Sequence, residues 1–158
     1  MKTIAILSDT HGLLRKELLT YLEQADVILH AGDIGAQTIV DTLQSYAPTY
    51  AVQGNNDVNW AQSLPQQLHF CIEGIRFFLV HKKTDVPKDL TDVDVIVYGH
   101  SHRYAASEQS GVFWLNPGSC GRRRFQQETS FCMMQAENGA YQIEKILIPP
   151  EAGSSAIC

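Results

Sequence analysis

Seven side chains that can bind metal ions follow short apolar segments of the sequence. They are carboxylates, imidazoles and one carboxamide: Asp9, His11, Asp33, Asn55, His81, His100 and His102. This combination suits Mn, Fe, Zn, Ni or Mg, and the absence of candidate thiolate ligands argues against a structural zinc site. Two divalent cations about 3.5–4 Å apart can activate a water and stabilise both oxygens of an in-line displacement at phosphorus. The set therefore indicates metal-assisted chemistry on a phosphate ester.

Each motif also has an ordinary structural alternative. Asp9 alone is more often a turn or helix-cap residue, and residues 32–33 or 54–57 could be turns, because Gly, Asn and Asp tolerate left-handed geometry. His81 alone would more often be a hydrogen-bonded histidine at a strand end. Residues 99–102 directly follow a predicted strand, and because alternate residues of a strand share one face, both imidazoles can point into one site. Taken together at successive strand ends, the motifs favour a metal site.

The elements that must position these residues alternate between strand and helix in the first half. Apolar runs at residues 3–7, 27–30 and 50–52 predict buried strands, each ending just before residues of the set. Apolar residues at helical spacing predict two amphipathic helices over the sheet, one with Leu14, Leu18, Tyr21, Leu22 and Ala25, the other with Ile39, Val40 and Leu43. Ligands bind at the carboxyl ends of strands in open α/β sheets, so the site is expected there.

The second half is predicted to consist mainly of hairpins. Turn signals at residues 73–74, 110–111 and 137–139 separate apolar segments, and residues 116–119 should form a further turn. Strands are expected at residues 68–72, 75–80, 94–98, 104–107, 112–115, 130–135 and 141–148. Early βα units followed by hairpins predict a mixed sheet, or two packed sheets, with helices outside. We expect one domain over residues 1–158, with a loose tail after Pro150.

Composition restricts the class of protein. The 158 residues are 44% hydrophobic and 18% charged, as in a globular domain, and the net charge of −5 argues against extended nucleic-acid binding. The one basic run is Arg122 to Arg124. The four cysteines include no C-x-x-C pair and are expected to be free thiols. Without an 18-residue apolar run or a signal-peptide core, we expect no membrane partner and a cytoplasmic location.

Other residues of reactive types are expected to be structural. His30 lies within a predicted strand, and His69 lies in an apolar stretch without other potential ligands. Cys71 and Cys120 are assigned to packing. Trp60 is expected to be exposed and could contribute to a homodimer.

The order of the motifs resembles the signature of the calcineurin-like metallophosphoesterases. The motifs are Asp9-x-His11, Gly32-Asp33, Gly54-Asn55-x-Asp57, His81 and Gly99-His100-x-His102. The short length and the Asn116-Pro117-Gly118-Ser119 segment resemble, more narrowly, the small bacterial and archaeal phosphodiesterases of the YfcE type. The resemblance covers roughly residues 3–148. It implies an α/β fold with a four-layer αββα sandwich: two packed mixed β-sheets flanked by helices.

The resemblance also implies a site with two divalent metal ions, Mn first, with Ni, Fe, Zn or Mg as alternatives. One ion would be held by Asp9, His11, Asp33 and His102, and the other by Asp33, Asn55, His81 and His100. Asp33 would bridge the ions, and the metals would convert a bridging water to the hydroxide that attacks a small phosphodiester. Asn55, Asp33 and His100 are the implied catalytic residues, and Asp57 would support the loop or a ligating histidine.

Two positions depart from the family pattern. Many members have a histidine after the motif Asn that can protonate the leaving oxygen, whereas this chain has Asn56, so substrates with good leaving groups such as aryl diesters should be preferred. Lys82 and Lys83 stand where Gly is usual, and this basic pair could face the phosphate. We take Asn56, Lys82 and Arg123 as candidate substrate contacts.

Two other functions compete with hydrolysis of a small diester. A non-catalytic scaffold similar to Vps29 would share the fold, but a scaffold is free to lose its metal ligands, and every matched position here holds a side chain that can ligate metal. A nuclease of the same superfamily is disfavoured by the small size and the acidic balance. The sequence therefore favours a hydrolase.

Overall fold

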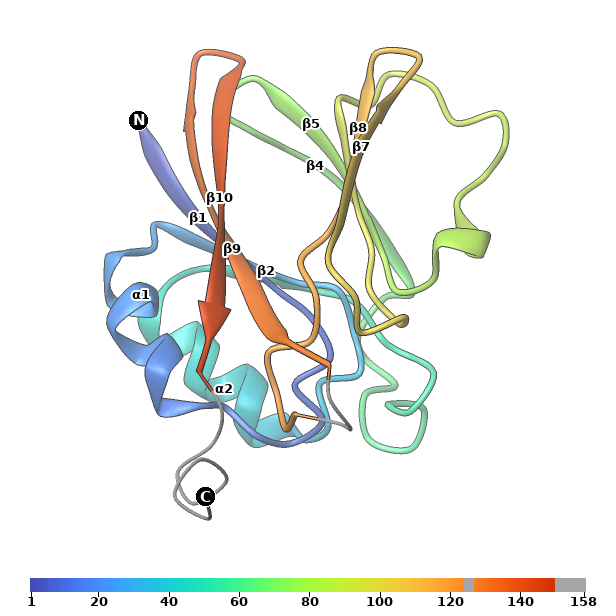
Figure 1. Cartoon of the computed structure of the whole chain (residues 1–158). Helices are drawn as coiled ribbons and strands as arrows, with labels where there is room; N and C mark the ends of the chain where they lie inside the picture. The colour runs from blue at the N-terminus through green and yellow to red at the C-terminus, as the bar shows by residue number, and fades with distance from the viewer. Residues whose placement is uncertain (124–126, 150–158) are drawn as a thin grey trace.

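The computed structural model describes residues 1–123 and 127–149, which form two five-stranded mixed sheets packed face to face (Figure 1). In chain order, the elements are β1 (Lys2–Leu7), η1 (Lys16–Leu18), α1 (Leu19–Gln24), β2 (Val27–His30), α2 (Gln37–Tyr46), β3 (Thr49–Ala51), β4 (Gln67–Ile72), β5 (Ile75–Val80), η2 (Lys83–Asp85), β6 (Val95–Val97), β7 (Ala105–Gln109), β8 (Val112–Asn116), β9 (Thr129–Glu137) and β10 (Ala140–Ile148). The expected α/β sandwich with two packed mixed sheets is confirmed.

The first sheet has the strand order β10-β9-β1-β2-β3. Its central strand β1 pairs in parallel with β2 and antiparallel with β9. Ile4 and Ile6 are fully buried against the second sheet, whereas Ala5 and Leu7 are fully buried on the face that α1 and α2 cover. Burial on both faces explains the continuous apolar run of β1.

The second sheet has the order β4-β5-β6-β8-β7. Its outer face carries Phe78, Val80 and Ile96, which pack under Val86 and Leu90 of the segment 82–94. The only regular element of that segment is η2, so this outer layer is much thinner than the pair of α-helices on the other side (Figure 1).

Hairpin turns form at all three places where turn residues separate the strands. Glu73-Gly74, Ser110-Gly111 and Asn138-Gly139 all have positive φ at both positions, between 50° and 84°. This is the pattern of a type I′ turn, whose twist matches the flanking strands. The three predicted hairpins are confirmed.

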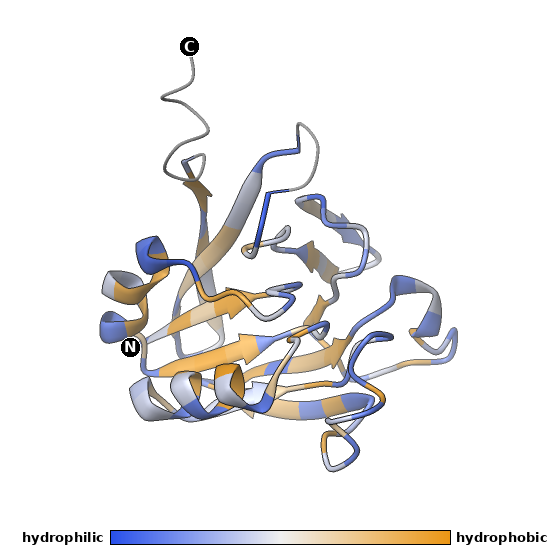
Figure 2. Cartoon of the chain, turned by 90° about the horizontal axis from the view of Figure 1, so that it is seen from below, coloured by the Kyte–Doolittle hydropathy of each residue, from blue (hydrophilic) through white to orange (hydrophobic). Residues whose placement is uncertain are grey.

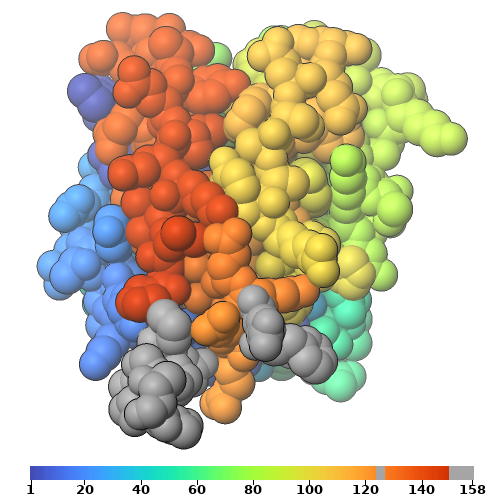
Figure 3. Space-filling view, viewed as in Figure 1, coloured from blue at the N-terminus to red at the C-terminus, as the bar shows by residue number. Residues whose placement is uncertain are grey.

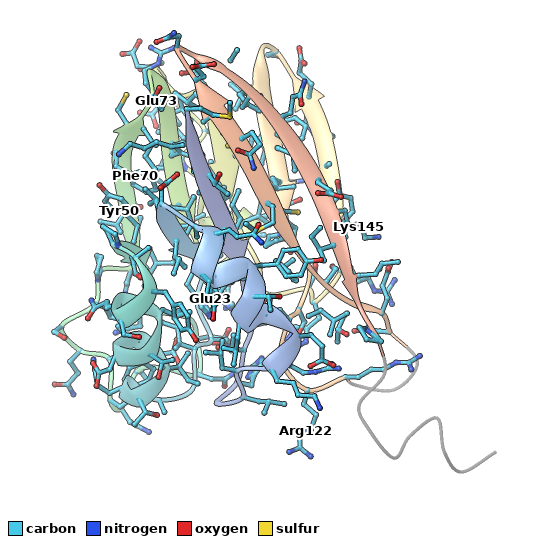
Figure 4. The ribbon with its side chains drawn as sticks, turned by 90° about the vertical axis from the view of Figure 1, so that its left-hand side faces the viewer. Glu23, Tyr50, Phe70, Glu73, Arg122 and Lys145 are labelled. Atoms are coloured by element: carbon cyan, nitrogen blue, oxygen red, sulfur yellow. The ribbon has the colours of Figure 1, made fainter. Side chains whose placement is uncertain are left out.

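Aromatic contacts join the two sheets at both open edges. Tyr50 of β3 stacks on Phe70 of β4 with ring centroids 4.1 Å apart (Figure 4). At the opposite edge, Phe113 and Tyr141 have ring centroids 6.0 Å apart, and β10 and the segments of the second sheet lie side by side in the space-filling view (Figure 3). These contacts pack the two sheets against each other.

The carboxyl ends of β1, β2 and β5 point toward the same end of the molecule, the lower end in Figure 1. Seen from that end, hydrophobic strands run into loops rich in hydrophilic residues (Figure 2). The site loops therefore come from both sheets. This is the arrangement predicted from polar residues at successive strand ends.

The first helical segment is shorter than its sequence pattern indicates. Helical backbone covers only residues 16–24, and Leu14 precedes it. The chain before it is held by other hydrogen bonds, since the Gly12 amide donates to Ile34 O at 2.7 Å and the Leu13 amide donates to Thr10 O at 3.0 Å. These contacts belong to the loop that carries His11.

Two assignments of apolar residues were wrong. Cys71 is exposed, because it alternates outward on the edge strand β4, and Trp60 is half-buried against the helical side of the core. Cys120, in contrast, is fully buried, and burial raises the pKa of its thiol to about 12.

Arg124, Cys158 and the tail that was expected to be loose lie outside the described residues. Among the described helices, none has the length and apolar character needed to cross a bilayer.

Candidate metal centre

The backbone at the strand ends adopts left-handed conformations at the candidate ligands. Asp9 and Asp33 have φ of 56°, His11 has 47°, and His100 and His102 have 74° and 64°. Such values are uncommon for residues other than glycine and concentrate at functional sites. Residues 99–102 form a loop beyond β6, so strand alternation does not apply to His100 and His102. The left-handed turns, rather than strand alternation, direct both imidazoles to the site.

The first group of candidate ligands consists of Asp9, His11 and His102. The Nε2 atoms of the two histidines lie 3.2 Å apart, and they lie 3.6 Å and 3.4 Å from Asp9 Oδ1 respectively. Three potential donor atoms thus converge on one point. Their chemistry, two imidazole nitrogens and a carboxylate oxygen, suits a borderline divalent cation.

The second group consists of Asp33, His81 and His100, with Asn55 beside them. His81 Nε2 lies 3.3 Å from Asp33 Oδ2, and His100 Nδ1 lies 3.2 Å from Asn55 Oδ1. His81 is almost completely buried, while His100 and Asn55 are exposed. The second group is therefore closed on the protein side and open to solvent on the other.

Asp33 lies between the two groups. Its Oδ2 atom is 3.3 Å from His81 Nε2 of the second group and 3.8 Å from His11 Nε2 of the first. Burial would raise the pKa of Asp33, but contact with His81 and the backbone N–H of Asn56 lower it well below its ordinary value. Asp33 is therefore ionised, as a carboxylate that ligates metal must be.

Two buried polar atoms at the centre lack a hydrogen-bond partner among the described residues: Asp9 Oδ1 and His81 Nε2. Leaving such atoms unpaired is costly, and native proteins rarely do so. The other atom of each side chain is occupied, since Asp9 Oδ2 accepts from Ser8 Oγ at 2.6 Å and His81 Nδ1 lies 2.7 Å from Ala31 O. The unpaired atoms are the ones that face the other candidate ligands, so the residues present fit a metal centre.

A buried hydrogen-bond network holds the loops that carry these residues. The backbone N–H of His100 donates to Asp9 Oδ2 at 3.1 Å, and Ser119 Oγ donates to Asp9 O at 3.0 Å. Asn116 donates through Nδ2 to Gly99 O and accepts at Oδ1 from the Gly118 amide, which makes the expected turn. The Asn-Pro-Gly-Ser segment thus ties the Asp9 and His100 loops together.

His30 is the structural histidine that the sequence indicated, and it lies directly beneath the centre. It is fully buried, accepts at Nδ1 from the Gly32 amide at 3.1 Å, and its Nε2 lies 3.0 Å from Thr10 Oγ1. Burial lowers the pKa of His30 to about 4, so the ring is neutral at pH 7. Through Thr10, which donates to Ile34 O, it links the loops that follow β1 and β2.

The two residues after Asn55 make hydrogen bonds to the loops of the centre, which for Asn56 differs from the expected substrate contact. Asn56 donates to Asp33 twice, from its backbone N to Oδ1 at 2.9 Å and from Nδ2 to Oδ2 at 3.0 Å. Its amide is therefore directed at a candidate ligand. Asp57 is fully buried and accepts from the backbone N–H groups of Ile34, Gly35 and Gly54. It supports the loops, as the sequence suggested.

The basic residues proposed for substrate binding are separated by the structure. Lys82 lines a cavity of about 160 Å³ together with Asn55 and His81. The ammonium of Lys83 instead lies over the rings of Tyr98 and Trp114, 5.8 Å and 5.5 Å from their centroids. This leaves Lys82 as the member of the pair beside the centre.

The arginines after the Asn-Pro-Gly-Ser segment do not share that cavity. Arg123 donates to Gln127 O at 3.0 Å and lines a separate hollow with Leu147 and Ile148. Arg122 points away from the body of the molecule (Figure 4). Arg103, which the sequence reading did not single out, lines a cavity of about 300 Å³ with His102.

Gly32→Ala is expected to weaken metal binding at the second group by about 10–100-fold, because it disturbs the contact that orients a ligand. A Cβ at position 32 would meet His81 Nδ1 at 2.7 Å, where that nitrogen contacts Ala31 O. Gly111→Ala is the matched control, since both glycines have positive φ, 102° and 80°, but position 111 has open space around it. Calorimetric titration of metal-stripped protein gives the affinities, and equal affinities in the two variants would contradict the role of Gly32.

Comparisons with known proteins identify the family of this chain. The model of the calcineurin-like phosphoesterase superfamily domain matches residues 1–139. A probable metallophosphoesterase of Methanothermobacter thermautotrophicus is 30% identical over 73% of this chain and 76% of its own length. A protein of Methanocaldococcus jannaschii named as a phosphodiesterase is 26% identical, over 74% of this chain and 83% of its own.

Solved structures show the same fold. Vps29 of Chaetomium thermophilum has a TM-score of 0.76 at 20% identity, covering 96% of this chain and 100% of that one. YfcE, a phosphoesterase from E. coli, has a TM-score of 0.68 at 24% identity, covering 93% and 100%. The fold is thus shared by a phosphoesterase and by Vps29, and the side chains at the strand ends must distinguish the functions.

Proposed function

Because this chain belongs to the calcineurin-like phosphoesterase superfamily, we propose that it is a dinuclear metal-dependent phosphodiesterase that hydrolyses a P–O bond of a small substrate. The observation that carries the proposal is the position of Asp33 Oδ2, which lies 3.3 Å from His81 Nε2 and 3.8 Å from His11 Nε2. One carboxylate oxygen can serve both groups because it has two lone pairs. Asp9, His11, Asp33 and His102 would hold one ion, and Asp33, Asn55, His81 and His100 the other.

Two divalent ions at this place would supply an activated water and neutralise charge on the phosphate. Mn²⁺ is the proposed ion, with Ni, Fe, Zn and Mg as alternatives of suitable ligand chemistry. The side chains of the protein would position these ions and the phosphate. With Oδ1 of Asn55 near His100, the amide nitrogen of Asn55 can donate to a phosphate oxygen at the exposed side of the second group.

Cavities on two sides of the centre support a diester rather than a monoester. One, of about 160 Å³, adjoins Asn55 and His81, and the other, of about 300 Å³, adjoins His102 and Arg103. A phosphate at the centre could place one arm in each. The curated relative named as a phosphodiesterase agrees with this proposal.

Good leaving groups should be favoured. The amide of Asn56, which stands where a proton-donating histidine is common in the family, is directed at Asp33 and cannot supply a proton to a leaving oxygen. Aryl diesters, whose phenolate leaves without protonation, are therefore suitable substrates.

The competing proposal is a Vps29-like scaffold. The fold alone permits it, because Vps29 shares the fold at a TM-score of 0.76. However, Asp9 Oδ1 and His81 Nε2 are buried and have no hydrogen-bond partner within residues 1–123 and 127–149, an arrangement that costs stability unless a ligand uses it. This favours the metal centre.

The test is hydrolysis of bis-p-nitrophenyl phosphate and p-nitrophenyl phosphate by metal-stripped protein refilled with Mn²⁺, Ni²⁺, Zn²⁺ or Mg²⁺. We expect turnover of the diester that rises with metal until about two equivalents are bound, and slower turnover of the monoester. A folded protein that binds these metals without hydrolysing either ester would favour the scaffold.

A further inference from the structure

A small cavity beside the second ligand group is large enough for only one short arm of a substrate. Its volume is about 160 Å³. Asn55 and His81 form the side next to the centre, and Val58, Gln66, Lys82 and Asp85 are among the other lining residues. A group attached to a phosphate at the centre would enter it directly.

Lys82 gives this cavity an unpaired positive charge. The side chain is half-buried, and across residues 1–123 and 127–149 its ammonium has neither a hydrogen bond nor an ion pair within 4.0 Å. Asp85 lines the same cavity, but it is connected to Lys82 through the backbone, where its N–H donates to Lys82 O at 3.0 Å. Lys83 differs, because its ammonium lies over two aromatic rings.

An ammonium that is partly withdrawn from water and unpaired is suited to bind an anion. A charge-assisted hydrogen bond to a carboxylate or phosphate is stronger than one between neutral groups. The reacting phosphate itself would be held at the metal centre by Asn55 and the ligand groups. The ammonium is therefore available for a second charge on the same substrate.

We propose that this cavity binds one arm of the phosphodiester and that Lys82 selects arms that carry a second anionic group, a carboxylate or a phosphate. The proposal rests on the proposed phosphodiesterase function and adds the class of substrate. Lys82 is a specificity-determining residue, and the side chain of Asp85 at the same cavity limits the selection through its opposite charge.

The experiment compares p-nitrophenyl phosphodiesters with one leaving group and three retained arms: propyl, 3-carboxypropyl and 3-phosphopropyl. We expect wild-type protein to prefer the anionic arms over propyl by about tenfold in kcat/KM, the size of one charge-assisted hydrogen bond at a half-buried site. Lys82→Met should bring the ratio close to one, Lys82→Arg should retain most of it, and Asp85→Asn should increase it. Lys83→Met, the adjacent control, should retain the wild-type ratio.

Binding provides a readout independent of turnover. Calorimetry of metal-loaded protein with 3-phosphonopropionate and with propylphosphonate should show tighter binding of the former in wild type and a lost difference in Lys82→Met, at unchanged metal content. The relative rates of the carboxylate and phosphate arms identify which anion is preferred.

The outcomes separate this inference from the function on which it rests. If wild-type protein showed no preference for the anionic arms, or if Lys82→Met showed the same preference as wild type, selection by Lys82 would be overturned. Hydrolysis of all three esters would still support the phosphodiesterase proposal in that case. No hydrolysis of any ester, by folded protein loaded with any of the metals, would instead overturn the phosphodiesterase itself.

Discussion

Asp33→Asn is expected to lower kcat/KM for bis-p-nitrophenyl phosphate by about a thousandfold or more, equivalent to about 4 kcal/mol of transition-state stabilisation. The substitution keeps the shape of the side chain and an oxygen for the backbone N–H of Asn56, which donates to Oδ1 at 2.9 Å. It removes the charge and the second oxygen that lie between His81 and His11. Both proposed ions lose a ligand in one step, so the effect should exceed that of replacing any ligand of one ion.

Asp41→Asn is the matched control for this variant. Asp41 is an exposed carboxylate on α2 that accepts from Gln37 Nε2 at 3.0 Å, away from the strand ends. Kinetics, bound metal by elemental analysis and urea unfolding should be measured on both variants. The control should match wild type, whereas Asp33→Asn should be folded, poorly loaded and inactive. If a folded Asp33→Asn protein kept its activity within about tenfold, a bridging carboxylate would not be required.

Three strand ends could be predicted because β1, β2 and β5, which lead to candidate ligands, are mostly buried and largely apolar. The β1 run ends at Leu7, and the first candidate ligand follows two residues later at Asp9. The run of apolar residues stops at that point, so the sequence predicts that Asp9 lies just beyond the end of a strand. The same holds for Asp33 after β2 and for His81 after β5.

The way in which the imidazoles reach the site could not be predicted from strand alternation. His100 and His102 have φ of 74° and 64°, values that residues with a Cβ rarely adopt. No pattern in the neighbouring sequence predicts them. These conformations are imposed by contacts distant in the chain, such as the bond from the His100 amide to Asp9, ninety-one residues earlier. Local propensity cannot report such contacts, so the sequence did not predict this backbone conformation.

The different surroundings of the two adjacent lysines also could not be predicted from the sequence. Lys82 and Lys83 have the same chemistry, but η2 begins at Lys83 and turns it toward Tyr98 and Trp114 on the outer face of the second sheet. Only the tertiary position of that short helix decides which ammonium remains beside His81. Similarly, Asn56 could only be assigned to Asp33 rather than to substrate once the loop geometry was known.

Asp57→Ala is expected to reduce the free energy of unfolding by about 3 kcal/mol or more, because three backbone N–H groups lose a charged acceptor. Asp57 Oδ2 accepts from Ile34 N at 3.1 Å and Gly54 N at 2.9 Å, and Oδ1 accepts from Gly35 N at 3.1 Å. The donors belong to the two loops that carry Asp33 and Asn55. The variant should therefore lose metal affinity as well as stability, although Asp57 contacts neither candidate ligand group through an ion pair among the described residues.

Asp26→Ala separates this effect from the general loss of an acceptor for a backbone N–H. Asp26 Oδ2 also accepts from a backbone N–H, that of Thr3 at 2.8 Å, but it is exposed, so water can replace the carboxylate. Its replacement should cost less than about 1 kcal/mol and leave metal binding unchanged. Urea unfolding of the metal-stripped proteins measures the stabilities without a contribution from bound ions. If the two variants lost similar free energies of unfolding, the buried carboxylate would stabilise the protein no more than an ordinary surface contact does. The link between Asp57 and the centre would then have to be abandoned.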